Sequence, residues 1–235
     1  MNTAFLRRIA SSLRWEVVLQ FRNGFYYAVG FIMACLVLIY TQLPQLDMRA
    51  VLPGILLGNL LVTTFYFMAG LVMLERGEGS LEARVVTPLR SSEYLLVKVL
   101  ALSLLVLAEN LLIAGMFSGF RFALFPASLG LVLAGIMFSL VGFLAVVRYD
   151  TINEFLMPSM GFTMVMMLPL LDFFDVVQSP LFLLHPLQAG LTLIEGGFRP
   201  LSGLEWAYGL TYSLVTVLVL FVLCRRAFRR FVTAR

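Results

Sequence analysis

Glu109 is the ionisable residue with the most unusual surroundings, because it interrupts an otherwise uncharged run from Val99 to Phe120. Asn110 follows it directly. A carboxyl group inside a long apolar helix is costly to bury, and such groups commonly mark proton relays or solute pathways. The same two residues could instead hold helices together through hydrogen bonds to Asn59, Thr63 or Thr64 of the second apolar run. The sequence leaves both roles open for Glu109 and Asn110, a transport pathway and structural pairing.

Other patterns that could support catalysis or metal binding are incomplete. Tyr149-Asp150 is similar to the first motif of intramembrane aspartyl proteases, but the second motif, GxGD, is absent. His185 is the single histidine, which excludes multi-histidine metal sites and the HExxH motif. Cys35 and Cys224 lie far apart without CxxC spacing, so neither a disulfide framework nor a metal site is supported. We therefore expect no catalytic residues, no metal and no cofactor bound by this chain.

The chain also lacks the residues that bind nucleotides. No GxxxxGK[ST] sequence, whose backbone and lysine would hold phosphates, is present. The run Leu201–Glu205 (LSGLE) is superficially similar to the LSGGQ signature of transport ATPases. Because no phosphate-binding loop accompanies it, we attribute this similarity to chance. Any ATP chemistry must come from another chain.

The overall composition indicates the kind of protein in which these residues lie. Of the 235 residues, 61% are hydrophobic and 13% are charged, and the mean hydropathy is +0.96. A soluble domain has about half apolar and about a quarter charged residues. A soluble globular protein and a disordered chain are therefore both excluded, and lipid is the expected solvent. The net charge of +4 does not indicate nucleic-acid binding, because the basic residues cluster at the ends of the apolar runs.

Six uncharged runs are long enough to cross a bilayer as helices, which takes about 20 residues. They are Asn23–Leu46, Ala50–Leu74, Val99–Phe120 (with Glu109 inside it), Phe122–Val147, Phe155–Leu171 and Trp206–Cys224. A further stretch, Val176–Ile194, contains Pro180 and Pro186, which remove backbone donors. Irregular backbone at membrane depth is tolerated only inside protein or beside water. We therefore predict an all-α membrane protein with six transmembrane helices and an outer re-entrant hairpin over residues 176–200, before the last helix.

The distribution of Lys and Arg orients these spans. With six spans, 14 of the 17 basic residues fall on one side, and Arg49, Arg121 and Arg199 fall on the other. Cytoplasmic loops carry the Lys and Arg excess, so both termini are predicted to be cytoplasmic, as in a multi-pass protein of a bacterial-type inner membrane. Residues 3–22 read as an amphipathic helix in the cytoplasmic interface. We expect its arginines Arg7, Arg14 and Arg22 to lie at the lipid headgroups.

The cytoplasmic loop 75–98 is the most distinctive segment. It carries eight charged residues, Gly77 and Gly79 as hinges, and a proline that ends a short helix. This composition suits docking to a partner protein, so we interpret the segment as a coupling loop. The residues expected to couple it to the partner are Glu75, Glu78, Gly79, Leu81, Glu82, Arg84, Thr87, Pro88 and Leu89.

This loop resembles the corresponding loop of ABC-2 type transporter permeases. The matching residues are Glu75, Gly79, Ser80, Leu81, Glu82, Val86, Thr87, Pro88, Leu89, Glu93, Tyr94 and Lys98, with Ser80 where threonine is commoner. The amphipathic helix, the six spans and the run His185–Gln188 extend the resemblance over the whole chain, so residues 1–235 are expected to form a single transmembrane domain. Within the family, Leu60–Phe67 and Arg148–Glu154 are similar to small bacterial permeases labelled as fluoroquinolone exporters.

The resemblance implies the permease subunit of an exporter for a drug-like, lipid-like or other amphipathic solute. It implies a dimer with a second copy or a similar permease, and two separate ATPase subunits that carry ATP and Mg²⁺. It also implies that the second and fifth spans line the dimer interface and that the segment around Pro180, His185 and Pro186 is an outer gate. The alternative is a proton-coupled secondary transporter that uses Glu109 and needs no ATPase. That class is expected to show paired broken helices, whereas this sequence has one broken segment.

Overall fold

The structure is a computed structural model, and it describes residues 3–42, 47–79 and 91–230. The described residues form helices and turns, with no strand among them. The helices are α1 (Thr3–Arg22), α2 (Phe25–Thr41), α3 (Met48–Leu60), η1 (Leu61–Tyr66), α4 (Phe67–Gly77), α6 (Ser91–Ser118), α7 (Leu124–Val146), α8 (Ile152–Met166), α9 (Pro169–Phe173), η3 (Pro180–Leu184), α10 (Pro186–Glu195) and α11 (Gly203–Phe228).

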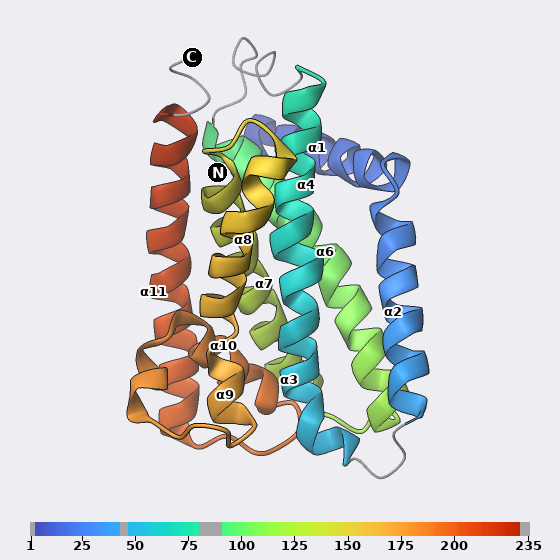
Figure 1. Cartoon of the computed structure of the whole chain (residues 1–235), viewed down its shortest axis with the longest axis vertical. Helices are drawn as coiled ribbons and strands as arrows, with labels where there is room; N and C mark the ends of the chain where they lie inside the picture. The colour runs from blue at the N-terminus through green and yellow to red at the C-terminus, as the bar shows by residue number, and fades with distance from the viewer. Residues whose placement is uncertain (1–2, 43–46, 80–90, 231–235) are drawn as a thin grey trace.

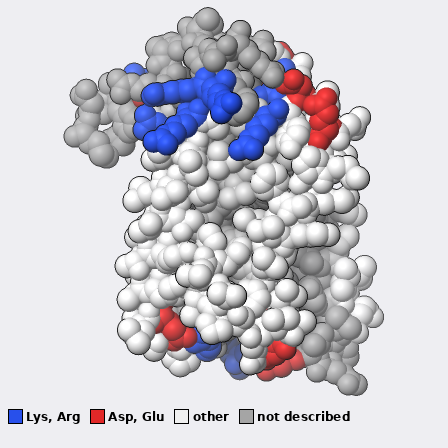
Figure 2. Space-filling view, turned by 60° about the vertical axis from the view of Figure 1, so that its left-hand side comes forward, with Lys and Arg blue, Asp and Glu red and all other residues white. Residues whose placement is uncertain are grey.

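Five helical stretches in the described part are long and apolar enough to cross a membrane, and α2 supplies a sixth when it is taken with α1 as one bent pair. The five are Arg49–Gly77, Ser92–Ser118, Leu124–Val146, Ile152–Phe173 and Gly203–Phe228. They stand roughly parallel in Figure 1, and Figure 2 shows a broad uncharged belt between two ends that carry the charges. The predicted all-α membrane fold is confirmed.

The amphipathic helix α1 crosses one end of the bundle, close to the end of α11 (Figure 1). Its bounds agree with the predicted segment 3–22. A bend of 62° separates it from α2, and Gly24 makes this turn with φ of +84°, a conformation that only glycine adopts without strain. Arg7, Arg14 and Arg22 are exposed along α1, as predicted.

Helix α7 forms the centre of the bundle, and 72% of its most apolar stretch is buried inside the chain. It packs against α6, α10, α11 and η1. Its contact with η1 is close: a Cβ at Gly142 would lie 2.6 Å from the backbone oxygen of Phe65, so this position admits only glycine without a shift of the backbone.

The segment 176–200 before the last span enters the bundle through its second half. Pro180 and Pro186 are each the first residue of a helix, η3 and α10, where the missing N–H has no intrahelical partner to lose. Helix α10 is buried from Leu187 to Ile194 and packs against α7 and α11. The prolines therefore begin two short helices, and the second of these forms the buried part of the re-entrant segment.

Candidate functional site: an ionic junction beneath the loop and a carboxyl group inside the bundle

Helices occupy more of the predicted coupling loop than the sequence indicated. Helix α4 continues to Gly77 and α6 begins at Ser91, so only residues 78–90 connect them. Glu78 and Gly79 are exposed at the end of α4. Glu75 also lies within the described residues. The remaining predicted coupling residues lie outside them: Leu81, Glu82, Arg84, Thr87, Pro88 and Leu89.

Glu75 is not in a loop at all, because it belongs to a buried group of charges that joins three helices. The Nζ atom of Lys98 in α6 lies 2.7 Å from Glu16 Oε1 of α1 and 3.0 Å from Glu75 Oε1 of α4. The Lys98 side chain is 0% exposed and both carboxylates are 2% exposed. The Tyr94 hydroxyl donates a hydrogen bond of 2.6 Å to Glu75 Oε2. We refer to Glu16, Glu75, Tyr94 and Lys98 as the ionic junction.

The burial of the ionic junction makes it sensitive to the loss of any member. Removing one partner of a buried pair leaves the other charge buried without a counter-charge, which costs about 3–5 kcal/mol of folding stability. A second pair, Arg8 with Glu93 at 3.2 Å, also joins α1 to α6, but Arg8 is half exposed and such pairs contribute at most about 1 kcal/mol. The ionic junction is therefore the stronger of the two links between α1 and the helices that flank the loop.

Arg76 makes a second connection from the end of α4. Its guanidinium group donates to the backbone oxygens of Val147, at 3.0 Å, and Tyr149, and pairs with Asp150 at 3.2 Å. These acceptors belong to the turn between α7 and α8. Two neighbouring residues of α4, Glu75 and Arg76, thus fasten it to α1 and α6 on one side and to the α7–α8 turn on the other.

The carboxyl group of Glu109 lies inside the bundle and is 3% exposed. Asn59 and Thr63 of the second span lie beside it, as the sequence predicted for structural pairing. Asn59 Nδ2 donates one of its two hydrogens to Asn110 Oδ1 at 3.2 Å, Asn110 Nδ2 donates to the Val106 oxygen, and Thr63 Oγ1 donates to the Asn59 oxygen. Both carboxyl oxygens of Glu109 and Oδ1 of Asn59 are left buried without a hydrogen-bond partner.

A proton on Glu109 would supply an O–H donor for Asn59 Oδ1, which has no other hydrogen-bond partner. Among the described residues, an ionised carboxylate there would be a buried charge with no ion-pair partner, which is strongly unfavourable in lipid. The adjoining segment of the second span, η1, is a π-helix, a distortion that often occurs at functional sites. The arrangement suits a neutral carboxyl group, in either a structural or a proton-carrying role.

The outer segment is tied to α8 through His185. Its Nδ1 accepts a hydrogen bond of 3.3 Å from the Leu187 N–H, so Nε2 carries the proton and donates to the Val165 oxygen at 3.1 Å. Burial lowers the pKa of His185, which keeps the ring neutral. This imidazole is thus a fixed bridge between the start of α10 and the outer end of α8.

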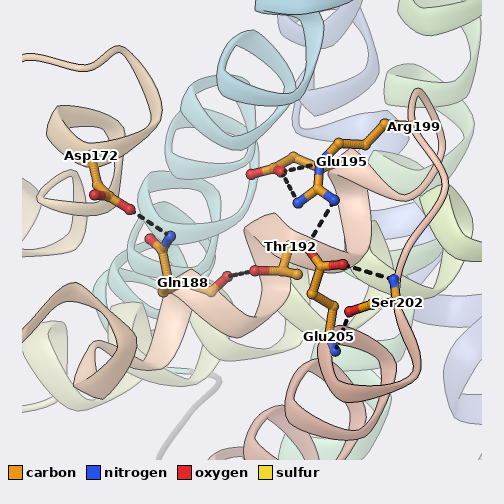
Figure 3. Close-up of polar contacts among 7 residues, drawn as sticks. All are labelled: Asp172, Gln188, Thr192, Glu195, Arg199, Ser202 and Glu205. Carbon is orange, nitrogen blue, oxygen red and sulfur yellow. Dashed lines mark hydrogen bonds and ion pairs between the residues drawn. The ribbon is translucent and has the colours of Figure 1, made fainter. Parts of the chain in front are cut away.

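A second set of polar contacts joins α9, α10 and α11 (Figure 3). Gln188 donates to Asp172 at 3.1 Å, and Arg199 pairs with Glu195 at 2.6 Å and with Glu205 at 2.7 Å. Ser202 and Glu205 form a capping box that begins α11. The LSGLE run therefore has a structural role as a helix start, which explains its resemblance to the ATPase signature without any nucleotide.

Comparison with known proteins decides the family. Residues 7–235 match the fluoroquinolones export permease protein family. The chain belongs to this family. Two proteins from different strains of Mycobacterium tuberculosis, each named a fluoroquinolones export permease protein, are 28% identical to it over 235 residues, covering 98% of both chains. The permease is therefore a membrane protein of an export family, and the resemblance drawn from its sequence is confirmed.

The sequence of the permease did not predict the ionic junction, although it contained a hint. Lys98 is the only lysine, and Glu16 is the only acidic residue before Asp47. The sequence predicts that Glu75 and Lys98 lie at the two ends of a cytoplasmic loop, whereas the structure buries both in helices. Among the predicted site residues, the structure brings Glu109 and Asn110 together with the second span, and Pro180, His185 and Pro186 together at the outer segment.

Proposed function

We propose that the permease is the membrane-spanning subunit of an ATP-driven exporter and that separate ATPase subunits dock beneath α4 and α6. The ionic junction is the observation that supports this most. The two helices that flank residues 78–90 are fixed to α1 and to the α7–α8 turn, so a force applied to the loop would move several helices as one body. The names of the relatives favour a drug-like solute that leaves the cell.

The proposed orientation places α1, the ionic junction and the end of α11 at the cytoplasmic surface. It is supported by the excess of basic residues, since Arg49, Arg121 and Arg199 alone belong to the other side. Single cysteines introduced at Arg49 and Arg121 should react with a membrane-impermeant thiol reagent in intact cells. Cysteines at Arg90 and Arg229 should react only after the membrane is opened. Labelling of Arg90 or Arg229 in intact cells would reverse the orientation.

The coupling loop provides the direct test of the proposed ATPase partner. Glu82→Arg and Arg84→Glu reverse charges in the loop and leave the buried ionic junction intact. Each should reduce both co-purification of the ATPase subunit and substrate-stimulated ATP hydrolysis, because a charge mismatch at a docking surface costs affinity. Arg148→Glu, an exposed charge change on the same surface, serves as the matched control. If both loop variants kept normal ATPase co-purification and normal substrate-stimulated ATP hydrolysis, the loop would not be the docking site of the ATPase.

A second permease copy is proposed to pack beside α8. Only 17% of the most apolar stretch of Ile152–Phe173 is buried inside the chain, compared with 72% for α7. The exposed side of α8 carries Met157 and Met164, which are 75% and 73% exposed, and Met160 between them. Methionine side chains adapt to varied apolar partners, which suits a pathway shared between two copies. The second span, predicted to join this interface, is 61% buried within one chain and contributes a smaller exposed surface.

The second candidate function is a proton-coupled carrier, and Glu109 is the observation that favours it. A buried carboxyl group whose oxygens have no donor is suited to take up and release a proton. Substitution of Glu109 separates this carrier from the ATP-driven exporter.

A further inference from the structure

The last two turns of α11 carry a hollow that the proposed transport cycle does not use. It has a volume of about 180 Å³ and is lined by Val222, Arg225, Arg226 and Arg229. We propose that this hollow binds the headgroup of an anionic phospholipid from the leaflet that surrounds this end of the bundle. The proposal does not depend on an ATPase, since it concerns only this helix and the lipid beside it.

No described acidic residue neutralises the charge of the hollow. Within the part of the chain that the structure describes, none of the three guanidinium groups has an ion-pair partner. Other basic groups at the same end are paired: Arg8 with Glu93, and Arg76 with Asp150. Three unpaired positive charges around one hollow attract an anion, and the guanidinium fork matches the geometry of a phosphate group.

The spacing of the lining residues aligns the hollow along one face of α11. Positions 225, 226 and 229 lie three, four and seven residues after position 222, so the four side chains follow one stripe of the helix. Val222 lies within the apolar run Trp206–Cys224, and the arginines follow immediately after it. The stripe therefore changes from apolar to basic along its length, in the same order as the acyl chains and the phosphate of a phospholipid.

Helix α11 is also open to lipid along this stripe. Only 17% of its most apolar stretch is buried within the chain, and Val222, Leu218 and Val219 are exposed. Figure 2 shows Lys and Arg side chains directly above the uncharged belt on this side of the molecule. An anion that reaches the hollow from the belt must have an apolar part in the bilayer, which favours a phospholipid over a soluble anion.

Native mass spectrometry of the purified permease, titrated with phosphatidylglycerol or phosphatidylcholine, tests the proposal. The unmodified permease should retain phosphatidylglycerol in preference to phosphatidylcholine. The double variant Arg225→Gln/Arg229→Gln should bind phosphatidylglycerol about 30-fold more weakly, because each arginine near an anionic lipid contributes about fivefold. Binding of phosphatidylcholine should not change.

The matched control removes two exposed arginines of α1 from the same end of the molecule. Arg7→Gln/Arg14→Gln should weaken phosphatidylglycerol binding by no more than about threefold, as expected for loss of general surface charge alone. An equal loss in both double variants would overturn the proposal in favour of nonspecific attraction. Saturation by inorganic phosphate with no lipid preference would assign the hollow to a soluble anion. Loss of ATPase co-purification in Arg225→Gln/Arg229→Gln, with lipid retention unchanged, would assign it to an acidic protein surface.

Discussion

Lys98→Met is expected to release α1 from the bundle and to prevent stable assembly of the permease. The substitution keeps most of the side-chain volume but leaves Glu16 and Glu75 buried without their cation. The expected loss is about 3–5 kcal/mol, a large part of the roughly 5–15 kcal/mol that stabilises a folded domain. The loss should appear as a lower melting temperature in detergent and as faster proteolysis within residues 3–22.

Arg199→Met provides the matched control for this prediction. Arg199 also contacts two carboxylates, Glu195 and Glu205, but its side chain is 44% exposed and lies at the opposite end of the bundle. Water replaces the lost contacts there, so its removal should cost at most about 1 kcal/mol. If Lys98→Met were no less stable than Arg199→Met, the ionic junction would not hold α1 in place.

A triple variant separates the stability of the ionic junction from its proposed mechanical role. Adding Glu16→Gln and Glu75→Gln to Lys98→Met removes all three buried charges together. Neutral replacement of a buried ionic group is often tolerated, so the folded permease should return. Because the three helices are then no longer linked by buried ion pairs, and only the half-exposed Arg8–Glu93 pair still joins α1 to α6, coupling of ATP hydrolysis to export should remain impaired. Full coupling in this variant would reduce the ionic junction to a structural element.

The transmembrane helices could be predicted from the sequence because a bilayer demands long apolar runs, and few other segments satisfy that demand. The faces by which these helices pack could not be predicted in the same way. In α1, Ile9, Leu13 and Val17 recur every four residues and form the apolar side of the predicted amphipathic helix, whereas the buried residues between Arg7 and Arg22 are Glu16 and Gln20. An amphipathic pattern shows which face avoids water, whereas the face that meets α6 depends on where Lys98 lies in three dimensions.

The site inside the bundle was predicted in part. The sequence offers Asn59, Thr63 and Thr64 as partners of Glu109, because polar groups in lipid pair with one another, and the structure places Asn59 and Thr63 beside it. Thr64 instead donates to the Leu60 oxygen. The π-helix η1 could not be predicted, since one additional residue in a helical turn leaves no trace in an uncharged run such as Ala50–Leu74. Its close contact with Gly142 likewise depends on two segments that are far apart in the sequence.

Glu109→Gln distinguishes the ATP-driven exporter from the proton-coupled carrier. In the exporter, the amide of glutamine permanently supplies the donor that Asn59 Oδ1 lacks, so ATP-driven export in proteoliposomes should stay within about twofold of the unmodified permease. In the carrier, an amide cannot exchange a proton, and transport driven by a pH gradient should be lost in a protein that still folds.

Glu109→Leu removes the donor in both cases and should cost about 1–3 kcal/mol of stability, because a buried acceptor is left unpaired. Measuring solute efflux with ATP alone, with a pH gradient alone and with both, in Glu109→Gln and in the unmodified permease, gives opposite results for the two functions. If folded Glu109→Gln failed to export with ATP, the structural role of this carboxyl group would be wrong, and the hydrogen-bonded proton inside the bundle would belong to the transport step itself.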